Sequence, residues 1–197
     1  LVELNLLNHQ SEFTLDCYFC VGLTEIFNEL TEGYEPHEHV KNLFSALCKS
    51  TNFKDDEITE ISKKTINLHE NKNLEEISNL IIEKSTKKVY YSRIFMLGIY
   101  KIISRANDFK DNEDITKIKI ISEIAEKLEL PNNRAEKDIS LYKNSIKRLI
   151  QARELLKETV LADRKKREEK SKKNWLFFNS SSIFPSNKRY INYGNSY

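Results

Sequence analysis

The stretch from Asn133 to Lys173 contains neither glycine nor proline. These are the residues that most often end helices and introduce turns, so their absence over such a length favours a single helix. If it is helical throughout, the stretch is about 40 residues and roughly 60 Å long. The whole chain of 197 residues has only four glycines and three prolines. A fold of many β-strands needs more turns than this, so the sequence predicts an all-α protein.

The apolar residues of this stretch recur at alternating spacings of three and four. They are Ile139, Tyr142, Ile146, Leu149, Leu156 and Val160. This pattern is the heptad seam of a coiled-coil-like helix, and Arg153 occupies its one polar position. Beyond Val160 the next seam position is Asp163, and residues 163–173 include no apolar side chain. We therefore expect residues 131–173 to form a long C-terminal helix that packs to about residue 160 and projects into water beyond it.

Several shorter helices, forming a multi-helix bundle, are predicted over residues 1–130. A helical apolar stripe reaches Leu30, and Gly33 is placed to end that helix in a left-handed conformation. Pro36 is expected in the first turn of the next helix, where its missing N–H has no cost. The candidate N-caps of later helices are Asp55 or Asp56, and Asn73. Residues 174–197 begin with an apolar cluster, turn serine-rich, and are expected to be a disordered tail.

The most apolar helix is predicted over Lys88–Ile103. Gly98 lies inside it at a cost of about 1 kcal/mol relative to alanine, so we expect a neighbouring helix to approach closely there. Arg93 lies in the same helix and has two interpretations. It binds a ligand, or it pairs with a carboxylate from another helix, which we favour. The candidate partners are Glu25, Glu29 and Glu32.

No motif for catalysis or nucleotide binding is present, and we predict no enzymatic activity, cofactor or metal. Cys17 and Cys20 form a C-x-x-C pair, with His37, His39 and Cys48 downstream. A zinc site is one interpretation. Zinc-binding cysteine pairs usually lie in turns, however, and this pair lies within a helical stripe. We favour a structural interpretation, in which the two cysteines are small residues near the core and the histidines lie on the surface. No apolar run is long enough for a transmembrane helix.

A local basic stretch lies near the end of the predicted long helix. Its members are Arg164, Lys165, Lys166, Arg167, Lys170, Lys172 and Lys173. The chain as a whole has a net charge of only +2, and no nucleic-acid-binding motif accompanies the stretch, so nucleic acid is not the expected partner. With Trp175 and the aromatics after it, the stretch is suited to an anionic membrane or a protein partner. The alternative is a solvated helix end.

Several segments together resemble one known family. The segments are LVELNLLNHQ (1–10), VGLTEIFNELTEGYEP (21–36), LFSALC (43–48), YSRIFMLGIY (91–100), KDISLY (137–142) and QARELLKETVLADRKKREEK (151–170). In this order they are similar to motifs of the thylakoid formation factor family, a photosystem II biogenesis protein of cyanobacteria and plastids. The resemblance covers roughly residues 1–170, and residues 174–197 match nothing in the family.

The resemblance implies an all-helical, non-enzymatic adaptor that is peripheral to the thylakoid membrane, on its cytoplasmic or stromal side. It implies a role in photosystem II biogenesis or repair and in thylakoid organisation, together with FtsH-type membrane proteases or photosystem II components. It gives no binding residues and no oligomeric state. The alternative from the residues alone is a membrane-surface module that docks through the basic helix end and the following aromatics.

Overall fold

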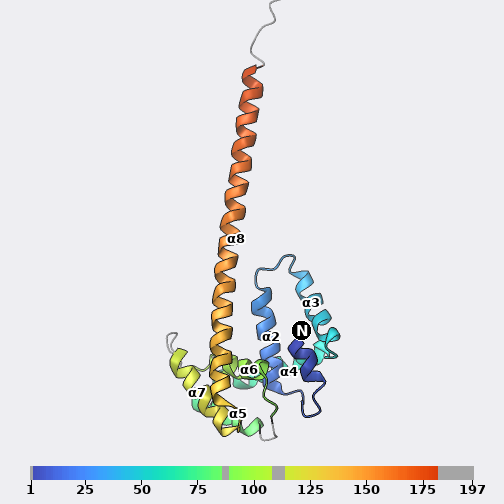
Figure 1. Ribbon diagram of the computed structural model, residues 1–197, viewed down its shortest axis with the longest axis vertical. Coiled ribbons are helices and arrows are strands. Elements are labelled where there is room, and N and C mark those ends of the chain that lie inside the picture. The colour runs from blue at the N-terminus through green and yellow to red at the C-terminus, as the bar shows by residue number, and fades with distance from the viewer. Residues whose placement is uncertain (1, 86–88, 108–113, 182–197) are drawn as a thin grey trace, which may run out of the picture. The chain divides into compact units, whose positions relative to one another are not determined.

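The computed structural model describes residues 2–85, 89–107 and 114–181. Within these ranges there are eight helices and no strand, which confirms the all-helical fold and the long final helix (Figure 1). The helices are α1 (Val2–Asn8), α2 (Cys17–Thr31), α3 (Glu38–Ser50), α4 (Asp55–His69), α5 (Leu74–Lys84), α6 (Arg93–Ile103), α7 (Asp114–Lys127) and α8 (Asn132–Ser181).

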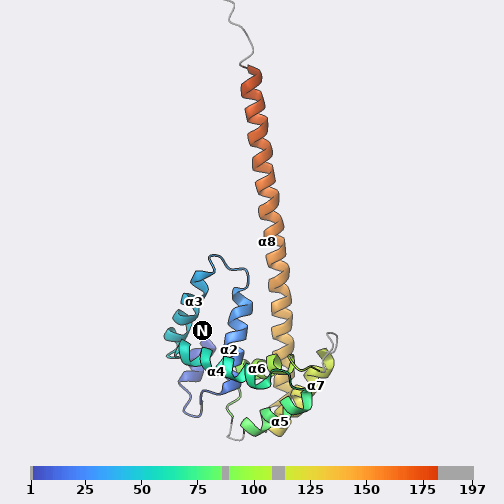
Figure 2. The same cartoon turned by 180° about the vertical axis from the view of Figure 1, so that it is seen from behind.

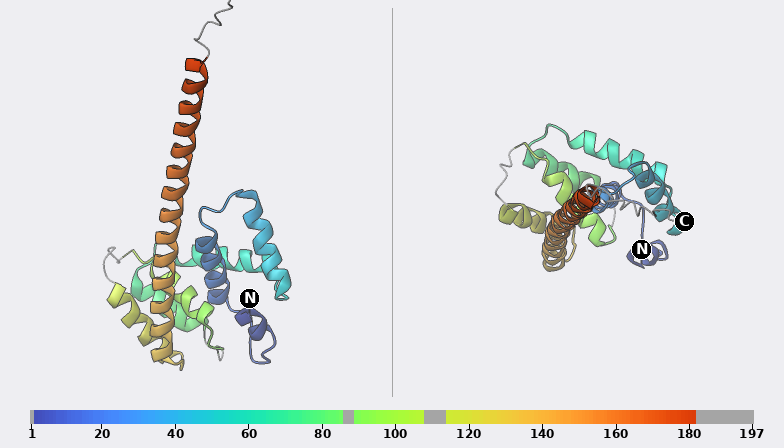
Figure 3. Two further views of the ribbon diagram at one scale, coloured as in Figure 1. Left: turned by 45° about the horizontal axis from the view of Figure 1, so that its top comes forward. Right: turned by 90° about the horizontal axis from the view of Figure 1, so that it is seen from above.

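The chain divides into two compact units, and the division falls inside α8. The first unit is residues 1–147 and contains α1 to α7 together with the start of α8. The second is residues 148–197, described as far as the end of α8. Within the first unit, α2 and α3 run side by side in opposite directions (Figures 1 and 3), and the rings of Phe27 and Phe44 join them at a centroid distance of 4.9 Å.

The closest packing in the first unit is between α2 and α6. A Cβ atom built on Gly98 would lie 1.8 Å from the carbonyl oxygen of Tyr18, and one on Gly22 would lie 2.0 Å from that of Ile94. No side chain fits at either position, so the two backbones touch. This confirms the close approach expected at Gly98 and identifies Gly22 as its counterpart on α2, which the sequence did not single out.

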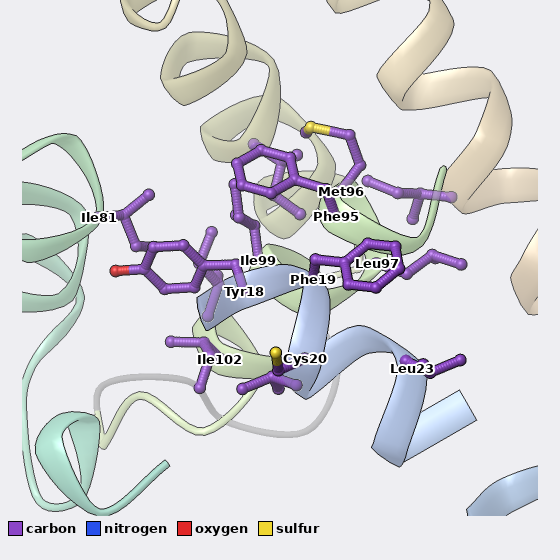
Figure 4. Close-up of a cluster of buried hydrophobic side chains, with 14 of the residues drawn as sticks. Tyr18, Phe19, Cys20, Leu23, Ile81, Phe95, Met96, Leu97, Ile99 and Ile102 are labelled. Atoms are coloured by element: carbon purple, nitrogen blue, oxygen red, sulfur yellow. The ribbon is translucent and has the colours of Figure 1, made fainter. Parts of the chain in front are cut away.

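The hydrophobic core is built around this crossing (Figure 4). Tyr18 and Phe19 from α2 are at most 1% exposed, as are Phe95 and Ile99 from α6. Ile81 of α5 lies beside Tyr18 in the same cluster. Each such side chain contributes about 1.5–3 kcal/mol when it is fully removed from water. Helices α4, α5 and α7 also pack against α2 or α6, which lie at the centre of the unit (Figure 2).

The helix ends follow local chemistry at two of the expected places. Gly33 has φ +73° just after α2, the left-handed conformation expected there. Asn73 caps α5: its Oδ1 accepts from the backbone N–H of Glu76 (2.9 Å), and the Glu76 carboxylate accepts from the N–H of Asn73 (3.1 Å). This reciprocal capping box satisfies two N–H groups that would otherwise have no partner at the helix start.

Two expected helix starts are wrong. Helix α3 begins at Glu38, so Pro36 lies before it and outside its first turn. The N-cap of α4 is Lys54, which makes no side-chain capping bond, and Asp55 and Asp56 are already helical. Carboxylates in the first turn still favour the helix, because they face the positive end of its dipole. That electrostatic preference does not require them at the cap itself.

Helix α6 begins later than predicted, at Arg93 instead of Lys88. The hydroxyl of Ser92 accepts a hydrogen bond from the N–H of Phe95 (3.1 Å), which caps the helix at that point. Val89 and Tyr90 precede the cap and are not helical. Their side chains still pack against the core, and this explains why the apolar periodicity extended past the true helix start.

A histidine is buried in this core beside Tyr18. His69 is 1% exposed, and its Nδ1 lies 2.7 Å from the carbonyl oxygen of Thr65. A carbonyl can only accept, so Nδ1 donates, and in the neutral ring Nε2 then accepts from the Tyr18 hydroxyl 3.3 Å away. Burial lowers the pKa of His69 from its ordinary value of 6.5, and the charges of Lys84 and Lys72 lower it further.

Stability should therefore depend on pH through His69. Above pH 6.5 the His69 ring is neutral in both the folded and unfolded states, and its full contribution to the free energy of unfolding is present. As pH falls below 6.5 the unfolded chain takes up a proton that the folded chain resists, so stability falls by at most about 1.4 kcal/mol per pH unit. We expect the difference in unfolding free energy between the wild-type protein and His69→Gln to shrink between pH 7.5 and 5. A difference independent of pH would contradict this.

Candidate partner surface on helix α8

The start of α8 is fixed in the first unit by a buried carboxylate. Asp138 is 7% exposed and accepts a hydrogen bond from the Tyr91 hydroxyl (2.8 Å). The Nε of Arg93 lies 3.3 Å from the other carboxylate oxygen, Oδ1, and the Nε of Arg134 lies 3.9 Å from Oδ2, the oxygen that accepts from Tyr91. Arg93 thus pairs with a carboxylate from another helix, as favoured.

The expected partners of Arg93 are wrong, because the carboxylate it contacts belongs to Asp138. Glu25 instead pairs with Arg105 (2.7 Å), and Glu29 contacts both Lys101 and Tyr142. Glu25 and Glu29 lie on the later turns of α2, and from that position they face the end of α6 and the start of α8.

The contact of Glu29 with Tyr142 is the second polar anchor of α8. The Tyr142 hydroxyl donates to the Glu29 carboxylate, and Lys101 pairs with the same carboxylate. The Lys101 ammonium also lies 5.2 Å from the centre of the Tyr142 ring. Burial and the neighbouring carboxylate raise the pKa of Tyr142, so its hydroxyl keeps the proton that it donates. With Ile139 fully buried between these anchors, the first turns of α8 are held in place.

Burial along the predicted seam decreases after these anchors. Ile139 is fully buried, Ile146 and Leu149 are half-buried, and Leu156 and Val160 are 64% and 61% exposed. The packing expected as far as Val160 concerns the second unit and stays a prediction. Arg153, the polar seam position, is half-buried. From Glu154 to Phe178 every side chain is exposed.

The predicted contact residues all lie on this exposed part of α8, in the second unit. Arg164, Lys165, Lys166, Arg167, Lys170, Lys172, Lys173 and Trp175 are each exposed. Arg164 pairs with Glu168 one turn later (3.3 Å), an exposed contact of small energetic weight. The stretch from Arg164 to Lys173 thus presents most of its positive charge to solvent.

Helix α8 continues to Ser181, past the expected end at Lys173. Trp175 to Phe178 are therefore helical, whereas the sequence led us to expect an irregular tail from Asn174. No proline or glycine interrupts the chain until Pro185, which allows the helix to extend. Trp175, Leu176, Phe177 and Phe178 are 64%, 60%, 75% and 78% exposed. The rest of the predicted tail, residues 182–197, lies outside the described residues.

Cys17 and Cys20 lie in the first turn of α2, where Cys20 is fully buried and Cys17 half-buried. Burial raises the pKa of these thiols to about 11 and about 12, so both are protonated at neutral pH. His37 and His39 are exposed beyond the other end of α2. In the described ranges no three His, Cys, Asp or Glu side chains are grouped to hold a metal. Both cysteines pack against the core, the role we favoured.

The first unit has a cleft of about 480 Å³ between α1 and the residues around the start of α6. Its lining includes Arg93 and Arg134, and also the acidic Glu3. Both arginines point a nitrogen at Asp138, so their charge is partly neutralised inside the protein. Among the described helices none is long and apolar enough to cross a membrane.

Comparison with known proteins agrees with the resemblance seen in the sequence. The family model described as thylakoid formation protein matches residues 1–171. The chain is 56% identical over 167 residues to Protein Thf1 of Prochlorococcus marinus subsp. pastoris (strain CCMP1986 / NIES-2087 / MED4), covering 85% of this chain and 83% of that one. It is 55% identical over 166 residues to Protein Thf1 of Prochlorococcus marinus (strain MIT 9312), covering 84% and 83%.

The fold is also similar to a solved structure of Psb29, with a TM-score of 0.71 over 85% of this chain and 84% of that one. The sequence identity is 22%, so this likeness speaks for the fold alone. The family model extends over most of the chain and stops just before the apolar residues at the end of α8. On the sequence match, this chain belongs to the thylakoid formation protein family.

Proposed function

We propose that this protein is a non-catalytic accessory factor that supports thylakoid formation and photosystem II biogenesis or repair. The observation that carries the proposal is the family match over residues 1–171, together with relatives named Protein Thf1 that cover most of the chain. The internal chemistry is consistent with a structural role. The buried carboxylate of Asp138 and that of Glu29 are used to hold helices together.

The exposed part of α8 is the surface we assign to the partner. The helix is 50 residues long, about 75 Å, and its side chains from Glu154 to Phe178 are exposed. Leu156 and Val160 lie on one face of it, because a separation of four residues brings side chains to the same side of a helix. Exposed apolar side chains with charged neighbours are typical of a binding surface for another protein. The partner we propose is an FtsH-type membrane protease or a photosystem II component, on the cytoplasmic or stromal side of the thylakoid.

The test is co-purification from solubilised thylakoids with a tagged full-length protein that replaces the native one. We expect a membrane protease or photosystem II subunits to be enriched relative to an untagged strain. The variant Leu156→Ser with Val160→Ser should recover at least about tenfold less of that partner, since it removes the apolar centre of the proposed surface. Leu161→Ser is the matched control, because Leu161 is equally exposed but points away from that face.

Absence of any enriched thylakoid protein would contradict the adaptor role. If the double variant and the Leu161→Ser control recover the same amount of partner, the partner binds elsewhere on the molecule. Circular dichroism of both variants checks that the helix content is unchanged.

A further inference from the structure

The positive charge of this protein is concentrated at the end of α8. Between Arg164 and Lys173, seven residues are basic and two are acidic, a net of five positive charges. The whole chain carries +2, so the remaining residues carry a net of three negative charges. Successive residues of a helix point 100° apart, so these basic side chains surround the helix on all sides.

The four residues Trp175 to Phe178 form an apolar ring directly after the basic stretch. Being consecutive, they span one full turn and point in four directions around the axis. All four side chains are at least 60% exposed. A helix that lies flat on a membrane has one apolar and one charged face, and this segment has neither. Its polarity changes along the axis instead of around it.

We propose that the end of α8 inserts end-on into an anionic lipid bilayer, with the apolar ring at the boundary between headgroups and acyl chains. Four residues rise about 6 Å along a helix, which matches the roughly 5–10 Å depth of that boundary. Lys170, Lys172 and Lys173 then lie at the lipid phosphates. Trp175 is suited to this depth, because an indole ring is apolar and carries one N–H donor.

The charge distribution favours lipid over a second copy of this chain. Two copies joined through the apolar ring side by side would bring their two basic stretches together, and like charges repel. An anionic bilayer has the complementary charge. The family match ends at residue 171, so the ring is a feature of this chain beyond the matched region. The lipid contact goes beyond the proposed function, since it needs neither a protease nor a photosystem.

End-on insertion has a consequence that flat binding does not. The three lysines nearest the ring lie within about 8 Å of Trp175 along the axis, which is one Debye length at physiological salt. Arg164, Lys165 and Lys166 lie roughly 14–17 Å away, where screening has removed most of their attraction. The three lysines near the ring should therefore contribute far more to binding of an anionic bilayer than the three basic residues far from it.

The experiment uses the full-length protein and the fluorescence of Trp175, the one tryptophan in the chain. The probes are vesicles of phosphatidylcholine alone or with 30% phosphatidylglycerol, and brominated lipids that quench tryptophan at known depths. We expect a blue shift and quenching with the anionic vesicles only, both reduced by 0.5 M salt. Two charge variants are compared. The near variant carries Lys170→Gln, Lys172→Gln and Lys173→Gln. The far variant carries Arg164→Gln, Lys165→Gln and Lys166→Gln.

The near variant should lower vesicle partitioning at least about tenfold, and the far variant by less than about threefold. Phe177→Ser with Phe178→Ser should also release the protein while keeping the Trp175 probe, whereas Leu155→Ser with Leu156→Ser should not. Unchanged fluorescence with anionic vesicles would overturn the proposal. So would equal effects of the two charge variants, or a blue shift that needs no lipid and grows with protein concentration. These readouts are independent of co-purification, so either proposal can fail alone.

Discussion

Gly98→Ala is expected to lower the free energy of unfolding by about 3 kcal/mol. The added Cβ would lie 1.8 Å from the carbonyl oxygen and 2.7 Å from the carbonyl carbon of Tyr18, so α2 and α6 must move apart. Both helices carry the largest buried side chains of the core, and separating them opens that packing. Overpacking against backbone cannot be relieved by a change of rotamer. Urea denaturation followed by far-ultraviolet circular dichroism measures the loss.

Whether Gly98→Ala stabilises or destabilises the protein shows which of two effects is larger, helix propensity or the clash between the two backbones. Helix propensity alone predicts that alanine stabilises the middle of α6 by about 1 kcal/mol. Gly33→Ala is the control, because no atom lies within 4 Å of its Cβ position and only its φ of +73° opposes a side chain. That change should cost about 1 kcal/mol. A Gly98→Ala protein more stable than the wild type would show that the two backbones are not in contact.

Asp138→Ala is expected to cost about 2 kcal/mol of stability. The carboxylate is buried, but the side chains of Arg93 and Arg134 are 55% and 62% exposed, so water can replace it for both guanidinium groups. The main cost is the hydroxyl of Tyr91, which is left without its acceptor in a partly buried site. Because Asp138 joins α8 to the segment before α6, the start of α8 should also loosen. Hydrogen exchange of the first α8 turns measures that part.

A double-mutant cycle identifies which contact matters. Tyr91→Phe removes the hydroxyl, and Asp138→Ala should cost clearly less in that background. Glu25→Ala is the matched control, since it breaks an ion pair whose arginine is 40% exposed and should cost less than about 1 kcal/mol. If Asp138→Ala lowers the free energy of unfolding equally with and without the Tyr91 hydroxyl, the loss comes from the ion pairs with Arg93 and Arg134.

Features that depend on neighbours in the sequence could be predicted from it. The capping box of Asn73 and the left-handed Gly33 are local, and their side chains or φ angles decide them. Gly98 could be predicted because its cost within a helix needs a compensating contact. Its partner Gly22 was not predicted, because only the crossing of α2 and α6 brings the two together.

Features set by distant partners were predicted less well. That Arg93 would form an ion pair followed from its apolar surroundings, but its carboxylate could not be chosen without knowing how α8 crosses α6. The exposed basic residues of α8 could be recognised from composition. The helical state of Trp175 to Phe178 could not, because aromatic residues are weak helix formers and the serines that follow favour turns.

The crossing of α2 and α6 also restricts how this protein can change by mutation. The clash is reciprocal: a Cβ on Gly22 would lie 2.9 Å from the backbone nitrogen of Gly98, and a Cβ on Gly98 equally close to that of Gly22. What each side chain would meet is main chain, which no second substitution can make smaller. A genetic screen for revertants of Gly98→Ala should therefore return the original glycine codon, and local suppressors should be absent from it.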